Sequence, residues 1–455
     1  MQKNIFIRRL VCVVLLGISA LSCFSQTEHP SSAFIPGTLL KKDFLLLRDT
    51  LEKSHPGMYR YKTKKEIDHV FDSCYASIKD SMSMIGFYKL TRFAIASIED
   101  GHSNCKLPEP VMNDFVSNAK VFPAMVLFIN SRAYIFCCKQ NAALTGAEIL
   151  SINGKPAAAI IQKMFSFIPS DAGITSRKNW ELPEFFHLLY NALYGEQNHF
   201  DIDYRLPDRT EGKTRLQPDI IKNIFCSNPF PRPKKYLELS YHPGGIAVLS
   251  IKTFFDGFLQ QTGENFHAFL DSAFTDIKKK GTKKLLIDLR RNQGGNDANG
   301  ALLYAYLTQK PFSYYASLET THEQFTSGHH SLLSIQQPEK NNFAGKVYVL
   351  ADGRSFSASA EFAAIAKSNQ RAIFLGEENG GGYYGNTSGD DLMLLLPNSQ
   401  ISCRVPLIKY TVAVKKSSNK GLGILPDYPL YPSITDIIQS KDGEMDEALK
   451  IVKVH

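Results

Sequence analysis

The sequence lacks several features that would assign it to a familiar class. It has no CxxC motif and no internal repeat, and its 52 Lys and Arg residues exceed its 44 Asp and Glu residues only mildly. Zinc-ribbon and repeat architectures are therefore not indicated. Lys3, Arg8 and Arg9 lie in an N-terminal segment without acidic residues, and the remainder has 49 basic against 44 acidic residues, so the net charge falls from +8 to +5. This small excess does not indicate a nucleic-acid partner.

The composition is that of a globular protein with more than one core. Apolar residues make up 44 % of the chain, and 30 Phe and 20 Tyr supply enough burial to argue against long disorder. A chain of 455 residues is too long for one hydrophobic core, so we expect two or three domains.

The first 25 residues have the pattern of an export signal. Positive residues precede an apolar run from Leu10 to Leu21, which is short for a transmembrane helix, and small and polar residues follow. We expect residues 1–25 to be a signal peptide cleaved after Ser25. Alternatively, Cys23 is lipidated in a loose lipobox, which would be the one route to a membrane, or the run is a buried helix. Both signal interpretations predict a periplasmic or secreted protein.

Export bears on the cysteines, because an oxidising compartment permits disulfides. The six cysteines beyond the signal show no tight framework of spacings. We expect most of them to be small buried residues and leave the pairing open. A metal site at the adjacent Cys137 and Cys138 is not expected, because no other ligand lies at suitable spacing. The six are Cys74, Cys105, Cys137, Cys138, Cys226 and Cys403.

Three regions follow the signal segment. Residues 38–118 have apolar residues at helical spacing, with a break at Pro56-Gly57 and a further helix predicted over 84–98. Residues 119–225 are predicted to be rich in β-structure, with strands over 121–128 and 133–138, an Asn153-Gly154 hairpin turn and a helix over 157–165. The proline-rich segment 228–233 is a plausible boundary.

From residue 236 onward, apolar strands alternate with helices, which predicts an α/β layer. The predicted strands are 246–251, 284–289, 347–350 and 372–375, and the predicted helices are 258–279, 296–307 and 357–368.

Three separated segments could carry chemistry. The segment 288–296 contains Gly294-Gly295 between a buried strand and a helix, where free backbone N–H groups can stabilise an oxyanion. The second segment, 355–362, follows a strand and opens the next helix, and a serine on such a turn could present its hydroxyl to a cleft. The third is Asp100-Gly101-His102-Ser103. Each also has an ordinary interpretation: a simple turn, a helix N-cap, and a structural histidine. From the residues alone, Ser359 and Ser103 remain alternative hydroxyls.

Together these segments resemble a known family. The DLRRNQGG turn, then VLADGRSFSASAEFA, then RAIFLGEENGGG resemble the tail-specific or C-terminal-processing serine peptidases. The upstream IEDGHS segment resembles the branch of the tricorn protease core and interphotoreceptor retinoid-binding protein, and the resemblance covers most of the chain after residue 38, including SHPGMYRY. The resemblance implies an α/β fold: a ClpP/crotonase-like catalytic core over 236–455, an N-terminal helical cap over 38–118 and a PDZ-like domain over 119–225 that contains GAEILSING.

The resemblance also implies roles for individual residues. Ser357, the second serine of its S-x-S-A element, would be the nucleophile. The N–H of Ala358 and one from Gly294 or Gly295 would form the oxyanion hole. No lysine occurs in 376–382, where the classical branch has its base, so the base would be His102.

Two departures concern the group that would orient His102. The tricorn-like set has a Ser before the His, where this chain has Gly101. It also has a Glu shortly before the closing G-x-x-P-D stretch, and near that position this chain has Lys420. The third catalytic member is therefore unassigned, with Asp100, Ser103 or another acid as candidates.

These observations predict an exported serine-type endopeptidase that hydrolyses peptides or unfolded proteins without a metal or diffusible cofactor. One alternative is a noncatalytic relative that binds peptides or apolar ligands. Another is a crotonase-type acyl-CoA enzyme, which the export signal disfavours. Other polar residues receive ordinary interpretations: Glu377 satisfies turn backbone, and His329 and His330 are not expected to bind metal.

Overall fold

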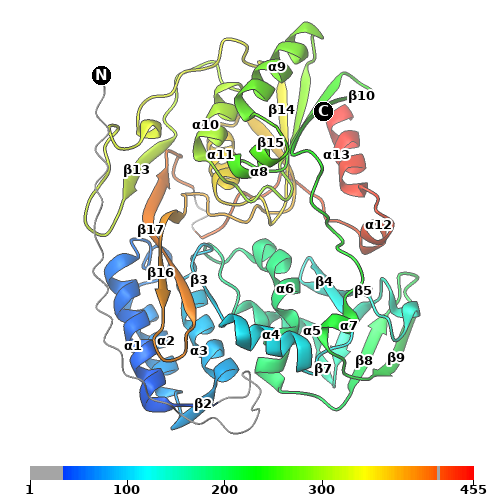
Figure 1. Ribbon diagram of the computed structural model, residues 1–455. Helices are drawn as coiled ribbons and strands as arrows, with labels where there is room; N and C mark the ends of the chain where they lie inside the picture. Colours follow the sequence, from blue (N-terminus) through cyan, green and yellow to red (C-terminus); the bar gives the residue numbers. More distant parts are fainter. Residues whose placement is uncertain (1–33, 418–420, 455) are drawn as a thin grey trace.

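The computed structural model describes residues 34–417 and 421–454 (Figure 1). The predicted signal peptide, Cys23 and Lys420 lie outside these residues. In the described part of the chain, no helix combines the length and apolar character needed to cross a membrane.

The largest sheet has the strand order β10-β11-β12-β14-β15-β18. β10 is antiparallel to β11, and the other neighbours are parallel. Because alternate residues of a strand face opposite sides, one face packs on α9, α10 and α11 and the other on α13. The predicted α/β layer is confirmed. Its strands are β10 (Leu237–His242), β11 (Ile246–Ile251), β12 (Lys284–Asp288), β14 (Lys346–Ala351), β15 (Ala372–Gly376) and β18 (Tyr428–Pro429).

The crossover helices of this layer agree with the sequence pattern, with one difference. The helix predicted over 258–279 is two helices, because a turn at 262–265 carries Gly263 with a positive φ. The helices are α8 (Asp256–Gln261), α9 (Phe266–Lys279), α10 (Asp297–Ala305), α11 (Ala358–Ser368), α12 (Ile434–Ile438) and α13 (Gly443–Val454).

The N-terminal region is mostly helical, as predicted, but it also contributes three short strands. The first helix ends before Pro56, and α3 matches the helix predicted over 84–98. The elements are β1 (Phe34–Pro36), α1 (Gly37–Ser54), α2 (Lys64–Ala76), β2 (Ser81–Ser83), α3 (Met84–Ser97), β3 (Asn104–Lys106) and α4 (Glu109–Asn118).

The middle region holds an antiparallel sheet of order β4-β5-β6-β8-β9, with β7 paired to β6. Its 20-residue helix α6 was not predicted, and Pro183 lies inside that helix. The elements are β4 (Met125–Ile129), β5 (Arg132–Cys137), β6 (Glu148–Ile152), β7 (Lys155–Pro156), α5 (Ala157–Phe165), α6 (Thr175–Tyr194), β8 (Phe200–Arg205), β9 (Glu211–Leu216) and α7 (Ile221–Ile224).

The structure identifies one cysteine pair that the sequence analysis left open. Cys137 and Cys226 form a disulfide that ties the connector after α7 to β5. Spacing alone did not indicate this pair, because the two residues are 89 apart in sequence. The other four described cysteines are free and buried, as expected.

A third sheet joins the helical region to the large α/β layer. It consists of β13 (Tyr315–Glu319), β17 (Ser402–Val412) and β16 (Thr387–Leu395), and β3 pairs with the start of β17. In Figure 1 the β16–β17 hairpin, in orange, reaches from the α/β layer to the blue N-terminal helices. Through this hairpin, the C-terminal part of the chain pairs with β3, the strand that follows His102.

The hairpin turn is anchored by a buried carboxylate on α1. Asp43 is fully buried and accepts hydrogen bonds from the backbone N–H groups of Asn398 and Ser399, the latter at 2.6 Å. It also accepts one from the Asn398 side chain. Buried polar groups require such partners, because an unmade hydrogen bond costs the desolvation free energy of the group.

Replacing Asp43 with Ala should therefore destabilise the protein by on the order of 2 kcal/mol or more, since two backbone donors lose their acceptor. Chemical denaturation would measure the change. Asp49→Ala on the same helix is the control, because Asp49 forms an exposed pair with Lys53 whose loss should cost less than about 1 kcal/mol. Equal losses in the two variants would contradict an anchoring role for Asp43.

Candidate active site

The turn between β14 and α11 holds Ser357 in a strained conformation. Ser357 immediately precedes α11 and has φ 55° and ψ −130°, which residues with a Cβ rarely adopt. Its side chain makes no capping hydrogen bond, so an ordinary N-cap role does not account for it. Strained backbone of this kind is concentrated at functional sites.

Hydrogen bonds between two neighbouring loops fix this turn. The Ser355 hydroxyl donates to the Leu289 carbonyl at 2.8 Å, and the N–H of Phe356 donates to the Asn292 carbonyl at 3.1 Å. Both loops follow parallel strands that are neighbours in the sheet, β12 and β14. The carboxyl ends of such strands lie at one edge, where α/β folds commonly bind ligands.

Paired glycines bring the backbone of the β12 loop against Ser357. Gly294 and Gly295 both have positive φ. A Cβ on Gly294 would lie 2.8 Å from the Ser357 Cβ and 2.9 Å from the Ala358 nitrogen, so only glycine fits.

The N–H groups of Gly294 and Gly295 differ in their hydrogen bonding. The N–H of Gly294 donates to the Asn292 side chain at 2.9 Å, so it is not free for an oxyanion. Within the described residues, the N–H groups of Gly295 and Ala358 donate no hydrogen bond. Of the two expected glycines, Gly295 is therefore the better oxyanion donor.

His102 lies in the loop between α3 and β3 and contacts the residue next to Ser357. Its ring stacks on Phe356 with centroids 4.4 Å apart. Burial is the largest effect and lowers the pKa of His102 to about 3; the Asp100 charge opposes it, and the charges of Arg404 and Arg177 lower the pKa further. The imidazole is thus neutral at neutral pH, as a general base must be. Its Nδ1 is buried without a hydrogen-bond partner among the described residues.

Two buried carboxylates hold the His102 loop. Asp100 accepts hydrogen bonds from the N–H groups of His102 and Ser103 at 2.8 and 2.9 Å. Asp171, in the loop before α6, accepts one from Gly101 at 2.8 Å and one from Gly382 at 3.0 Å. Asp171 thereby connects the loop of His102 with the glycine-rich segment that follows β15.

Asp100, His102 and Asp171 also form the one group in the described chain with metal-ligating atoms this close together. One ring nitrogen and one oxygen from each carboxylate lie within 4.8 Å of one another. The two carboxylates already accept four backbone N–H groups, which favours a hydrogen-bonding role over metal ligation. Burial and the neighbouring Asp100 charge raise the pKa of Asp171 to about 6, whereas His55 and His102 hold that of Asp100 below its usual value despite burial.

His55 completes this support from the SHPGMYRY segment. Its Nδ1 accepts the Gly57 N–H at 3.1 Å, so its Nε2 carries the proton and can donate to the Ser103 hydroxyl, 3.0 Å away. The same Nε2 lies 3.5 Å from Asp100. The hydroxyl of Ser103 is therefore engaged in a structural network.

Ser357 and His102 line one cavity of about 660 Å³. No hydrogen bond joins their side chains in this structure. The cavity is electrically two-sided, with the basic Arg177 and Arg404 and with the acidic Asp256, Asp297 and Glu361. The other lining residues are Gly101, Asn104, Phe255, Gln293, Gly295, Asn296, Tyr315, His330, Phe356, Ala358, Ser388, Gly389 and Tyr410.

The acidic side contains a buried hydrogen-bond network. Glu361 accepts from the Tyr315 hydroxyl and from the Asn386 side chain, both at 2.7 Å. Burial and the Asp297 charge raise the pKa of Glu361 to about 7. Nε2 of His330 lies 3.2 Å from Asp297, so this histidine belongs to the network rather than to an exposed polar stretch.

Other candidates have structural partners or lie apart. Ser359 is fully buried and does not line the cavity. Glu377 accepts hydrogen bonds from the Trp180 indole at 2.8 Å and from the Gly353 N–H at 3.1 Å, in agreement with the turn-supporting role predicted for it. Burial raises the pKa of the Glu377 carboxyl to about 8.

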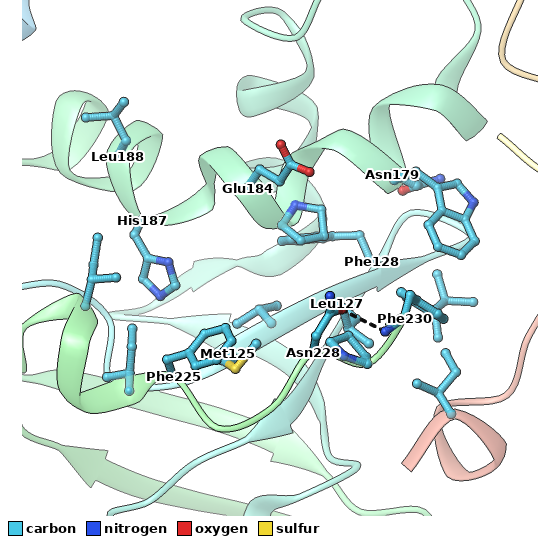
Figure 2. Close-up of a pocket in the computed structure, with 18 of the residues that line it drawn as sticks. Met125, Leu127, Phe128, Asn179, Glu184, His187, Leu188, Phe225, Asn228 and Phe230 are labelled. Carbon is cyan, nitrogen blue, oxygen red and sulfur yellow. Dashed lines mark hydrogen bonds between the residues drawn. The ribbon is translucent and has the colours of Figure 1, made fainter. Parts of the chain in front are cut away.

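A second cavity, of about 420 Å³, lies between α6 and the edge strand β4 (Figure 2). Figure 2 shows α6 on one side, with Glu184 and His187, and the connector residues Phe225 and Phe230 on the other. Most of its lining is apolar. The ring of Phe230 packs against Trp180 at 4.9 Å, so the connector itself forms part of the wall.

Sequence reasoning missed two supporting residues. His55 lies in the SHPGMYRY segment, which was noted for its resemblance but given no role. Asp171 lies in the segment Pro169-Ser170-Asp171, where nothing in composition or spacing marks a functional acid.

Comparisons with known proteins found a matching family model and similar folds. Residues 245–430 match the sequence model of peptidase family S41. The structure of mature CPAF complexed with lactacystin is similar, with a TM-score of 0.62 and 13 % identity over 92 % of this chain and 98 % of that one. Mature CPAF alone gives a TM-score of 0.61 and 14 % identity, with coverages of 92 % and 97 %. A putative peptidase from Parabacteroides merdae reaches a TM-score of 0.47 at 14 % identity, with coverages of 90 % and 96 %. No curated protein matches the sequence.

The glycine before His102 has a steric explanation that can be tested. A Cβ at Gly101 would lie 2.8 Å from the Phe356 ring, so Gly101→Ser should displace the ring on which His102 stacks. We expect a loss of about 1 to 3 kcal/mol in unfolding free energy from overpacking. Gly173→Ser is the control, because the nearest atom to its Cβ would be 3.9 Å away. Equal thermal stability of the two variants would contradict the steric explanation.

Proposed function

We propose that the protein, whose residues 245–430 match the model of peptidase family S41, is an exported endopeptidase that cleaves peptides or unfolded proteins through an acyl-enzyme on Ser357. The observation that carries the proposal is the strained Ser357, set in one cavity with His102 and beside the N–H groups of Gly295 and Ala358, which donate no hydrogen bond within the described residues. Export rests on the N-terminal pattern alone.

In the proposed mechanism, the Ser357 hydroxyl attacks the scissile carbonyl while His102 takes its proton and later donates it to the leaving amine. The N–H groups of Ala358 and Gly295 stabilise the oxyanion. Water then hydrolyses the acyl-enzyme with His102 again as the base. The contact between Ser357 and His102 forms when substrate binds, since catalytic hydrogen bonds are often long in ligand-free enzymes.

We assign Asp171 as the positioning acid of His102, in the role that the sequence analysis left open. A carboxylate oxygen of Asp171 lies within 4.8 Å of a ring nitrogen of His102, a separation that one water molecule can bridge. Each carboxylate oxygen accepts about two hydrogen bonds, and each of those of Asp171 has one backbone donor. Asp100 is more fully engaged, because one of its oxygens already accepts two N–H groups and the other faces His55.

The apolar cavity between α6 and β4 supports a second binding role within the same function. Its size and apolar lining fit an apolar segment of the polypeptide substrate. The match of residues 245–430 to a peptidase family favours the catalytic role over the noncatalytic and acyl-CoA alternatives.

The nucleophile can be tested with two serines of the same segment. Ser357→Ala should reduce kcat/KM for an unstructured peptide by at least about 1,000-fold, because no other group forms the acyl-enzyme. It should also abolish labelling by a fluorophosphonate. Ser359→Ala should leave both nearly unchanged, because Ser359 does not line the cavity. Retained turnover in Ser357→Ala would refute the assignment.

The role of Asp171 can be tested through the pH dependence of kcat. The pKa of Asp171 is raised to about 6, and its carboxylate faces Asp100, His102, Arg60 and Tyr61. Below that pH it is protonated and cannot support the imidazolium, so kcat should fall as pH decreases through 6. The low pKa of His102 places its own protonation outside this range.

Asp171→Asn should lower kcat by on the order of 100-fold, leave KM nearly unchanged and remove the decline near pH 6. Asp100→Asn is the comparison, because the pKa of Asp100 is held below its usual value and its loss should leave the position of that decline unchanged. If Asp100→Asn removes the decline and Asp171→Asn retains it, the assignment is wrong.

A further inference from the structure

Two cysteines face each other across the strand pair that follows His102. β3 and β17 are antiparallel, and their register sets Cys105 directly opposite Cys403. Side chains of directly opposite residues lie on the same face with Cβ atoms about 4.5 to 5.5 Å apart. A disulfide needs Cα atoms about 4.4 to 6.8 Å apart and Cβ atoms somewhat closer than that pair spacing, so a small local adjustment brings the two sulfur atoms into bonding range.

Both thiols lie in the same apolar cluster, packed with α1, α2 and α3. Cys105 is 2 % exposed and Cys403 is fully buried. Burial raises the pKa of Cys105 to about 12 and that of Cys403 well above its usual value, and the second thiol adds to the shift at Cys403. The thiolate is the nucleophilic and metal-binding form, so neither cysteine is suited to catalysis or metal binding in the folded state.

The chain already contains one disulfide, Cys137–Cys226. Of the remaining described cysteines, only Cys105 and Cys403 are paired with each other in a strand register. Cys74 lies on α2, and Cys138 directs its thiol to the Pro123 carbonyl at 3.8 Å. The geometry therefore singles out one further pair.

We propose that Cys105 and Cys403 form a second disulfide, which fastens the strand after His102 to β17. Two S–H bonds break and one S–S bond forms. The two electrons and two protons pass to a small-molecule disulfide, which is reduced to two thiols. Because both sulfur atoms are inaccessible in the folded protein, the bond forms during folding, when β3 first pairs with β17.

The proposed disulfide lies close to the loop of His102. β3 begins two residues after His102, and the next pair in the register, Asn104 opposite Arg404, lines the cavity of Ser357. β3 has only three residues, so few backbone hydrogen bonds hold it. A covalent link at its centre would keep the His102 loop in place against the core hairpin.

The direct test reads the sulfur atoms and does not depend on the proteolytic function. The reduced, denatured chain is refolded in a mixture of reduced and oxidised glutathione, then denatured again, alkylated without reduction and digested. Peptide mass spectrometry should find a Cys105–Cys403 cross-link beside Cys137–Cys226, with Cys74 and Cys138 alkylated. Alkylated Cys105 and Cys403 in the refolded protein would overturn the proposal.

A variant series gives an independent answer if refolding is poor. In a Cys137→Ser/Cys226→Ser background, dithiothreitol added during folding should still lower the melting temperature, because the second disulfide remains. Cys105→Ala, Cys403→Ala and the double variant should show equal losses, since a bond is lost once. Cys74→Ala, which also removes a buried thiol, should leave the effect of dithiothreitol intact. The proposal would be overturned if the losses in melting temperature from Cys105→Ala and Cys403→Ala were additive, or if dithiothreitol had no effect. Either result would show that the two thiols are not bonded to each other.

Discussion

The whole site depends on the two hydrogen bonds that Asp171 accepts. Its carboxylate receives the N–H of Gly101, from the helical region, and the N–H of Gly382, from the α/β layer, while Asp171 itself belongs to the middle region. Three parts of the chain therefore meet at one buried charge. The charge is compensated by backbone donors rather than by a single ion pair, as buried charges require. This junction therefore joins the loop of His102 directly to the glycine-rich segment after β15.

The strained backbone of Ser357 is held by close packing between two loops. A positive φ at a residue with a Cβ costs of order 1 to 3 kcal/mol and persists only where the surroundings determine it. Here the Ser355 hydroxyl joins the loops after β12 and β14. Gly294 packs so closely against Ser357 that a Cβ at position 294 would clash with it. At the same place, the N–H groups of Ala358 and Gly295 donate no hydrogen bond within the described residues. Strain and free donors thus arise from one packing arrangement.

Much of this arrangement could be predicted from the sequence because its signals are local. A buried strand followed by Gly294-Gly295, and a strand followed by a serine at a helix start, indicate their turns directly, and neighbouring parallel strands bring such turns to one edge. The helix α6 was missed because Pro183 argues against a helix interior. The Cys137–Cys226 pair and Asp171 were missed because their roles depend on tertiary contacts between distant segments, and no periodicity records those contacts. Gly101 was a departure from the family pattern whose reason, the Phe356 ring, is visible only in three dimensions.

The electrostatics of His102 favour a base that works only when substrate is bound. Burial and the nearby arginines keep the imidazole neutral but weakly basic, so in the empty cavity it has little tendency to take the Ser357 proton. Bound substrate excludes water and strengthens every charge interaction in the cavity. In the proposed mechanism, the imidazolium formed during attack would then gain most from the carboxylates of Asp100 and Asp171, which are close to it and poorly screened. Stabilisation of this kind acts on the transition state rather than on the resting enzyme, which is the condition for it to raise kcat.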